Sequence, residues 1–377
     1  MKIYYFDNAA TTKVSNNVLN KMLPYLNDEY GNPSTMYRIG RSAKKAIEEA
    51  RSNVAELINS ESKEIIFTSS GTESDNTAIK GIAYNYRTQG NHIITSKIEH
   101  PAVLNSCKNL EKRGFRVTYL NVDKNGMINI EELKKSINST TILISIMMAN
   151  NEIGTIQQIL EISKIAKQHG IIFHTDAVQA AGNININVKE MGIDLLSISG
   201  HKLHAPKGVG ALFIRDGIMF ERFMDGGHQE SNKRASTENV AGIVGLGTAC
   251  IDAKENIEEH IKKLIELRDY YISQVEKNIP KAILNGSLQN RLPGNANFSF
   301  EGKSSEELLL KLDAKGICVS GGSACSTGDS SPSHVLMAIG LSENQAKSAI
   351  RVSFGEDNTI EDVDYLVSTL KEIIEEK

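Results

Sequence analysis

The amino-acid sequence predicts a layered α/β domain followed by a smaller α+β domain. Short apolar, β-prone runs alternate with segments whose apolar residues recur every three or four positions, a pattern typical of strands and helices in a mostly parallel sheet. The chain has 377 residues. That length suits about two domains and a substantial buried core.

The predicted strands of the first domain are separate apolar runs. The run TILISIMMA (141–149) is continuously apolar, as expected for a strand that helices cover on both faces. Between the runs, residues such as Ala43, Ile47 and Val54 fall on one face of a predicted helix. The strand candidates span 64–70, 92–96, 116–122, 141–149, 171–177, 195–199 and 208–214.

The pattern changes at about residue 238, where the smaller domain is expected to follow. A long amphipathic helix is predicted over 255–278, and apolar residues at helical spacing over 360–373 predict a final helix. Short strands are predicted over 295–302, 316–321 and 349–355.

Composition and charge exclude several classes of protein. The net charge of −4 gives no basic surface for nucleic acid, and no run of 18 apolar residues predicts a membrane span. The start, MKIYYFDNAATT, lacks the apolar core of a secretory signal. The four cysteines, at 107, 250, 318 and 325, show no regular spacing. We therefore expect a cytoplasmic protein without a disulfide framework.

Polar residues follow the predicted strands at their carboxyl ends, where open α/β sheets bind ligands. After EIIF, Gly71 and Thr72 open a predicted helix whose N-terminus could bind a phosphate, or Ser70 or Thr72 could simply cap that helix. After HIITS comes His100, which is either structural or functional. After TILISIMMA come Asn150 and Asn151, whose amides either cap a turn or bind a ligand.

Two further strands are followed by a carboxylate and by a lysine. Asp176 ends an apolar run, so it is expected to be buried and to need a cationic partner, either a side chain or a protonated heterocycle; Gln179 could point the same way. Ser199 and His201 precede Lys202 in a polar turn between two apolar strands. Lys202 could be a partly desolvated amine of the kind that forms Schiff bases, although a surface lysine is the default.

A phosphate site, a stacking imidazole, a buried carboxylate and a lysine together match the needs of pyridoxal phosphate. The sequence also resembles the cysteine desulfurases, group I, of the class V aminotransferase family, which are fold-type I pyridoxal-phosphate enzymes. The resemblance rests on the following motifs: YFDNAATT (5–12), GNPSTMYRIGR (31–41), TSSGTESDN (68–76), EHPAV (99–103), NNEIGTIQ (150–157), HTDAVQAAG (174–182), SGHKLHAPKGVGAL (199–212), GGHQE (226–230), RASTEN (234–239), SGGSACSTG (320–328) and RVSFG (351–355).

The resemblance implies a fold, a homodimer and a set of site residues. A large cofactor domain with a mostly parallel seven-stranded sheet would span 15–257, and a small domain would combine 1–14 with 258–377 and carry the cysteine loop near 320–333. The resemblance implies that Lys202 is the Schiff-base lysine, that Asp176 pairs with the ring nitrogen, that Gln179 pairs with the phenolic oxygen and that His100 stacks on the ring. The phosphate would be held by Gly71, Thr72, Ser199 and His201, together with Thr237 of the second subunit. Asn151 and Arg351 would bind the substrate carboxylate, and Cys325 would be the sulfur acceptor.

The implied reaction is desulfuration of L-cysteine to L-alanine with a persulfide on Cys325, with His100 as the expected acceptor of the thiol proton. The sulfur would pass to an acceptor protein for iron–sulfur cluster assembly or for thiolation of tRNA or a cofactor. The alternatives are a selenocysteine lyase, another class V aminotransferase, or a silent binding module, which the presence of Lys202 and Cys325 disfavours. Ser236 departs from the family pattern, which usually has glycine there.

The cysteines also admit a metal interpretation. We expect no resident metal, although Cys325 could serve as a transient iron–sulfur ligand. A zinc site formed by Cys318, Cys325 and His334 is disfavoured because their spacing lacks the usual paired ligands. Cys107 and Cys250 lie in apolar helical contexts and are expected to pack as small hydrophobic residues.

Overall fold

The structure is a computed structural model that describes residues 2–321 and 331–376. Its larger unit is a seven-stranded sheet in the order β2-β8-β7-β6-β5-β3-β4. All neighbouring pairs are parallel except the two that β8 makes with β2 and β7, so the predicted mostly parallel sheet is confirmed. The strands are β2 (Ile65–Thr68), β3 (His92–Ser96), β4 (Arg116–Leu120), β5 (Thr141–Ser145), β6 (Ile172–Asp176), β7 (Leu195–Ser199) and β8 (Gly210–Ile214).

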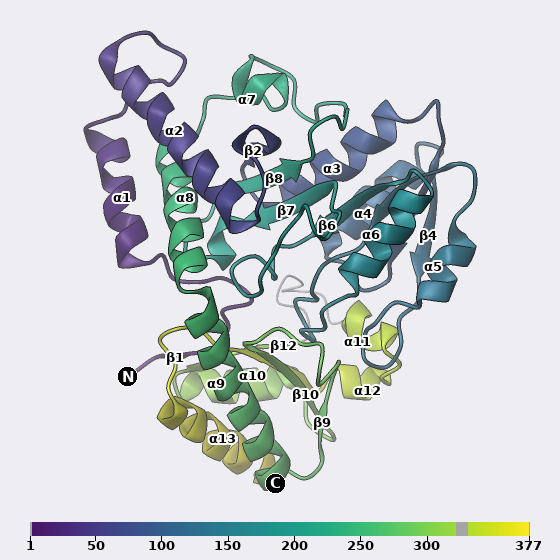
Figure 1. Cartoon of the computed structure of the whole chain (residues 1–377). Helices are drawn as coiled ribbons and strands as arrows, with labels where there is room; N and C mark the ends of the chain where they lie inside the picture. Colours follow the sequence, from purple (N-terminus) through teal and green to yellow (C-terminus); the bar gives the residue numbers. More distant parts are fainter. Residues whose placement is uncertain (1, 322–330, 377) are drawn as a thin grey trace.

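Helices cover both faces of this sheet (Figure 1). Two apolar clusters form the core, one containing Phe173 and Ile198 and the other containing Ile79 and Leu143, so the sheet is buried on both sides as its apolar strands predicted. The helices are α1 (Asn16–Asn27), α2 (Arg38–Leu57), α3 (Gly71–Asn85), α4 (Pro101–Glu111), α5 (Ile130–Ser136), α6 (Ile159–Gln168), α7 (Gln229–Asn232) and α8 (Val240–Glu255), with 3-10 turns at Ser62–Glu64 and Gly200–Lys202.

The smaller unit lies below the large sheet in Figure 1 and has its own core around Tyr271 and Phe298. Its four-stranded antiparallel sheet has the order β12-β13-β10-β9, and its long helix α9 packs against α13. The elements are α9 (Ile257–Asn278), β9 (Ala282–Leu284), β10 (Asn295–Phe300), α10 (Ser305–Ala314), β11 (Ile317–Cys318), β12 (Ser320–Gly321), α11 (His334–Ala338), α12 (Glu343–Ala346), β13 (Ala349–Ser353) and α13 (Ile360–Glu375).

Both ends of the chain meet in this smaller unit. Strand β1 (Tyr4–Tyr5) pairs in parallel with β11, and Asp7 bridges to Ser353 at the end of β13. The predicted single strand over 316–321 is wrong in one respect: the chain divides there into β11 and β12, which join different sheets because β11 pairs with the N-terminal strand. The proposed boundaries 1–14, 15–257 and 258–377 stay a prediction.

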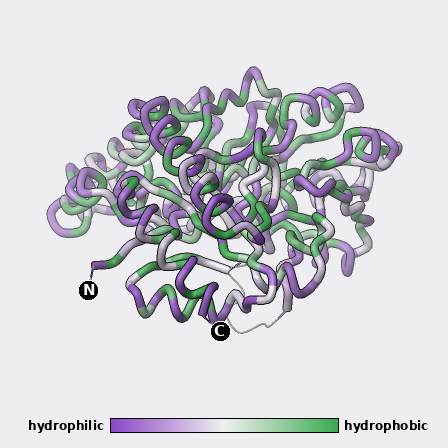
Figure 2. The backbone as a smooth tube through the Cα atoms, turned by 90° about the horizontal axis from the view of Figure 1, so that it is seen from below, coloured by the Kyte–Doolittle hydropathy of each residue, from purple (hydrophilic) through white to green (hydrophobic). Residues whose placement is uncertain are grey.

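Amphipathic helices such as α2, α6 and α13 expose a polar face. Seen from below, hydrophilic and hydrophobic stretches alternate along the helical turns at the rim of the molecule (Figure 2). Within the ranges that the structure describes, no helix combines the length and apolar character needed to cross a bilayer.

Candidate active site

The strand-end residues that the sequence singled out gather beside the N-terminal segment of residues 7–12. Strand β6 delivers Asp176, which is 6% exposed, and the turn after it carries Gln179. Strand β7 ends at Ser199, 3% exposed, and the 3-10 turn that follows carries His201 and Lys202. Adjacent parallel strands end at the same edge of a sheet, so these groups lie side by side.

Lys202 and Gln179 meet at the backbone of the N-terminal segment. The Nζ atom of Lys202 donates to the carbonyl oxygens of Ala9 (2.7 Å) and Ala10 (2.5 Å), and Nε2 of Gln179 donates to that of Ala9 (3.0 Å). His201 contacts the same segment through Nδ1 and the Thr11 hydroxyl, 3.2 Å apart. The predicted surface-lysine alternative is therefore wrong, because Lys202 is half-buried and bonded across the site.

His100 and Asp176 lie together with a third group that the sequence analysis missed. The ligand atoms of Asp75, His100 and Asp176 all lie within 4.8 Å of one another. Asp75 is 1% exposed, and its Oδ1 atom has no hydrogen-bond partner in the described part of the chain. Its place in TSSGTESDN, one helical turn after Thr72, was the available signal.

Burial sets the protonation of this cluster. It raises the pKa of Asp75 well above its ordinary value, and the neighbouring Asp176 raises it further. Burial also raises the pKa of Asp176, whereas His100, the Val178 amide and Lys202 oppose that rise. Because two buried carboxylates this close cannot both be ionised cheaply, we assign the proton to Asp75 and the negative charge to Asp176. Asp176 thus offers an anion to a protonated ring nitrogen.

His100 is a neutral imidazole whose ring orientation is fixed. It caps α4, and its Nδ1 accepts a hydrogen bond from the Ala102 amide at 3.1 Å. Burial lowers the pKa of His100, with Asp176 opposing that change. The neutral ring therefore carries its proton on Nε2. Accepting a thiol proton would require Nδ1 to release Ala102, so that expected role of His100 stays a prediction.

The N-terminus of α3 lies against Ser199. Ser70, rather than Thr72, is the helix cap, because its hydroxyl accepts from the Glu73 amide at 3.2 Å. Thr72 is exposed at the second position of the helix. A methyl group on Gly71 would lie 2.6 Å from Cγ2 of Val178 and 3.3 Å from Cβ of Ser199. A helix end packed this closely, next to two hydroxyls, suits an anion such as a phosphate.

The helix end is also tied to the segment that carries Thr237. Glu73 accepts from Arg234 at 2.7 Å and 3.1 Å, an ion pair that lowers the pKa of Glu73 against the effect of burial. Thr237 itself is exposed, three residues along. Its neighbour Ser236 has φ +108°, a conformation that favours glycine, which explains why glycine suits this position.

The predicted carboxylate-binding residues lie on the other side of the N-terminal segment. Arg351 in β13 is 1% exposed; its Nη2 donates to Oδ1 of Asp7 (2.7 Å) and its Nη1 to the carbonyl oxygen of Asn151 (3.0 Å). The preceding residue, Asn150, caps the local turn by accepting from the Glu152 and Ile153 amides. The turn-capping alternative thus applies to Asn150, and Asn151 is half-buried beside Arg351.

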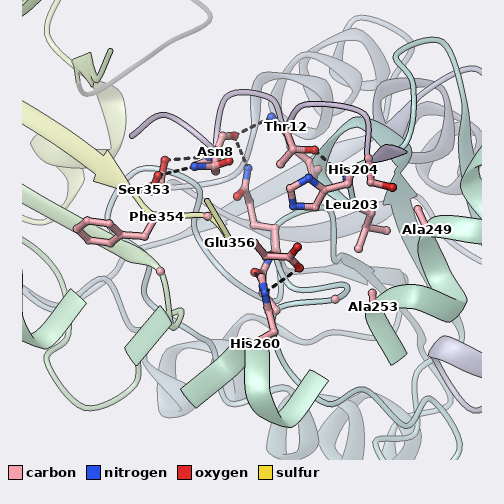
Figure 3. Close-up of a pocket in the computed structure, with 18 of the residues that line it drawn as sticks. Asn8, Thr12, Leu203, His204, Ala249, Ala253, His260, Ser353, Phe354 and Glu356 are labelled. Atoms are coloured by element: carbon pink, nitrogen blue, oxygen red, sulfur yellow. Dashed lines mark hydrogen bonds and ion pairs between the residues drawn. The ribbon is translucent and has the colours of Figure 1, made fainter. Parts of the chain in front are cut away.

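A cavity of about 340 Å³ opens between the two units next to these groups (Figure 3). It is lined by Lys202, Gln179 and Asn8, and it extends toward His260 and Glu356 rather than toward His100 or Asp176. Asn8 donates to the Ser353 carbonyl at 3.0 Å, and His260 pairs with Glu356 at 3.4 Å. We take the strand-end cluster as the reacting site, because Asp176, His100 and the N-terminus of α3 belong to that cluster and do not line this cavity.

The structure describes three of the four cysteines. Cys325 lies outside the described residues. Cys107 and Cys250 are buried, and burial raises the pKa of both thiols, that of Cys250 to about 12, which confirms them as inert core residues. Cys318 is half-buried in β11, and among described residues the Asp75–His100–Asp176 group is the one cluster with metal-ligand geometry.

The donor set fits pyridoxal phosphate better than a metal ion. A buried anionic carboxylate, a flat neutral imidazole, a helix N-terminus and a lysine within one site are the groups that a phosphorylated pyridine aldehyde needs. Burial raises the pKa of both Asp75 and Asp176, and with the proton on Asp75 the cluster offers a metal ion one anionic carboxylate rather than two.

Comparisons with known proteins cover nearly the whole chain. Residues 4–366 match the family model described as aminotransferase class-V. A protein named cysteine desulfurase IscS from Dictyoglomus turgidum is 53% identical over 371 residues, which are 98% of this chain and 94% of that protein.

Two solved structures are also similar. One titled NifS-like protein superposes with a TM-score of 0.94 at 38% identity, covering 99% of both chains. A structure of SspA in complex with cysteine superposes with a TM-score of 0.81 at 38% identity, covering 93% of this chain and 98% of that one.

Proposed function

This chain belongs to the class-V aminotransferase family, and within it to the cysteine desulfurases, and from this premise we propose how it removes sulfur from L-cysteine. The resemblance seen in the sequence and the fold-type I architecture are confirmed. The observation that supports the proposal best is the convergence of Lys202, Gln179, Asp176 and His100 at the ends of two adjacent strands and the start of α4.

Pyridoxal phosphate, when bound, supplies the electron sink that lets the bonds of the substrate break. We assign the ring nitrogen to Asp176, the phenolic oxygen to Gln179 and the ring face to His100. Lys202 would hold the cofactor's carbonyl carbon covalently. Gly71, Thr72, Ser199 and His201 would hold the phosphate, because they surround the N-terminus of α3 and the end of β7. Asn151, beside Arg351, would complete the substrate pocket.

The chain's own groups then carry out the steps around the substrate. Arg351 binds the α-carboxylate, and Lys202 takes the proton from Cα. The thiolate of Cys325 attacks the substrate sulfur, so a sulfur–sulfur bond forms as the Cβ–sulfur bond breaks. Cβ then gains a proton and Lys202 returns a proton to Cα, so the products are L-alanine and a persulfide on Cys325.

We extend the proposal to the assembly and the destination of the sulfur. A homodimer would let Thr237 reach the phosphate of the second subunit, which agrees with its exposure in this chain. The persulfide would pass to an acceptor protein in the cytoplasm, for iron–sulfur cluster assembly or for thiolation of tRNA or a cofactor. Preference for selenocysteine is the main alternative within the same site, and a transaminase would release pyruvate instead of alanine.

The proposal is tested by the mass of the intact protein after incubation with L-cysteine. The wild-type protein should gain one sulfur atom and release L-alanine, whereas Cys325→Ser should bind pyridoxal phosphate and gain none. Cys318→Ser, which removes a half-buried thiol in the nearby strand β11, is the matched control and should behave as wild type. Equal sulfur gain and turnover by Cys325→Ser would overturn the assignment.

A further inference from the structure

The guanidinium of Arg351 is buried and forms an ion pair with one acid among the described residues. Its side chain is 1% exposed, and Asp7 is the acid in its ion pair at 2.7 Å. Glu152 is also close, but burial raises its pKa to about 7, with Ser333 and Arg351 opposing the rise. A buried cation needs an anion, so Asp7 is the counter-ion that keeps Arg351 in this position.

Asp7 leaves part of the guanidinium open for a second carboxylate. Arg351 donates one hydrogen bond from Nη2 to Asp7 and one from Nη1 to Asn151, while its buried Nε atom has no partner among the described residues. A guanidinium has five N–H donors in a planar fork. Because Nε is buried, leaving it unpaired is costly, and an entering carboxylate would relieve that cost.

Asp7 is itself held in place by groups of the small domain. Its second oxygen, Oδ2, accepts from the Ser320 hydroxyl at 2.7 Å, and its backbone bridges to Ser353. The hydroxyl of Tyr5 donates to the Asp7 carbonyl oxygen at 3.0 Å. Both carboxylate oxygens and the main chain of Asp7 are therefore fixed before any ligand arrives.

The residues that directly follow Asp7 contact the cofactor side of the site. Ala9 and Ala10 accept from Lys202, Ala9 also accepts from Gln179, and the hydroxyl of Thr11 lies 3.2 Å from Nδ1 of His201. Asn8 points the other way, to Ser353, at the cavity wall (Figure 3). One short segment thus connects the guanidinium in β13 with the lysine after β7.

We propose that Asp7 is a positioning residue that sets the distance and angle between the carboxylate-binding guanidinium of Arg351 and the reacting lysine. The inference rests on the proposed function, because it assumes that Arg351 binds the α-carboxylate of the amino acid. Asp7 does not touch the substrate; it acts through Arg351. It therefore selects for ligands that carry a carboxylate, and ligands without one should not depend on it.

The test compares L-alanine with L-alaninol, which lacks the carboxylate, on the holoenzyme by calorimetry. Asp7→Asn should weaken L-alanine binding by about tenfold, the effect of losing one charge-assisted hydrogen bond, and should leave L-alaninol binding unchanged. The KM for L-cysteine should rise by a similar factor, while kcat changes by less than about threefold. Ser320→Ala, which keeps the charge of Asp7 but frees its Oδ2 atom, should cause a smaller shift in the same direction.

Controls separate positioning from a general loss of structure. Asp362→Asn removes another partly buried acid of the small domain, the partner of Lys2, and should leave both ligands unaffected. The affinity of the apoprotein for pyridoxal phosphate should be equal in wild type and Asp7→Asn. Equal weakening of L-alanine and L-alaninol, or no weakening of L-alanine, would overturn the role of Asp7.

Arg351→Ala tests the underlying function separately. It should abolish the preference for L-alanine over L-alaninol. If that preference survives in Arg351→Ala, the carboxylate assignment of Arg351 is wrong. If it is lost there but unchanged in Asp7→Asn, only the inference about Asp7 fails.

Discussion

The Nζ atom of Lys202 lies 2.7 Å from the carbonyl oxygen of Ala9, and Gln179 donates to the same oxygen. Lys202 follows strand β7 and Gln179 follows β6, while Ala9 comes from the opposite end of the chain. A lysine that donates to two carbonyl oxygens has to leave these oxygens to hold a cofactor. The N-terminal segment is therefore part of the reacting site.

Replacing Lys202 by alanine should abolish covalent attachment of pyridoxal phosphate. After borohydride reduction, the intact mass of the wild type should include one reduced cofactor, and that of Lys202→Ala should not, because the amine that forms the bond is gone. Lys207→Ala is the matched control: this lysine is exposed in the following turn and should not alter the mass gain. Attachment that persists without Lys202 would refute its role.

Gly71→Ala should weaken binding of pyridoxal phosphate, because the new methyl group would meet Val178 at 2.6 Å beside Ser199. Displacing the helix end by a few tenths of an ångström should cost about 1–3 kcal/mol of binding free energy, on the scale of overpacked cores. The double variant Gly71→Ala/Val178→Ala removes the clashing atom and should recover most of the affinity in a fluorescence titration of the apoprotein. Failure of this rescue would mean that the clash is not the cause.

Glu152→Gln should change how stability depends on pH. Burial raises the pKa of Glu152 from 4.5 to about 7, so the folded state holds a proton that the unfolded state has lost. The stabilising contribution of this proton is complete below pH 4.5 and is lost as the pH rises through about 7. Relative to the wild type, Glu152→Gln should therefore gain up to about 3 kcal/mol between pH 5 and pH 8.

The measurement for Glu152 is the denaturant midpoint of the apoprotein at both pH values. Glutamine keeps an oxygen that can accept from the Ser333 hydroxyl, so the substitution tests ionisation rather than the hydrogen bond. Glu301→Gln, at an exposed position, controls for the loss of one surface charge. An identical pH profile for Glu152→Gln and the wild type would contradict the prediction.

Ser236→Gly should stabilise the protein. Ser236 has φ +108°, where a side chain is strained, so glycine should gain about 0.5–1 kcal/mol after the cost of its greater freedom in the unfolded chain. Ser236→Ala keeps the Cβ atom and removes only the hydroxyl, so it should not stabilise. The melting temperatures of the three proteins test this prediction. A lower melting temperature for Ser236→Gly than for the wild type would contradict it.

Much of the fold and the positions of several candidate site residues were predictable because they depend on local patterns. The apolar run before Asp176 predicted a strand that is buried along its whole length, and the turn after β7 placed Lys202 correctly. In contrast, Asp75 was missed because its place one helical turn after Thr72 does not by itself distinguish it from an exposed acid in the first turns of a helix. Only the packing of α3 against the sheet brings it within 4.8 Å of Asp176 and His100.

The sequence alone determined the order of strands and helices, the chemical identity of the strand-end groups and the family. The tertiary structure decided that Asp75 and Asp176 share one proton, that Ser70 caps α3 and that Asp7 holds Arg351. The ion pair between Asp7 and Arg351 joins residues 344 positions apart, and it forms only when β1 has paired with β11 and both chain ends are packed in one unit. Periodicity and propensity report on neighbours within a few residues, whereas such a contact depends on the folding of the whole chain.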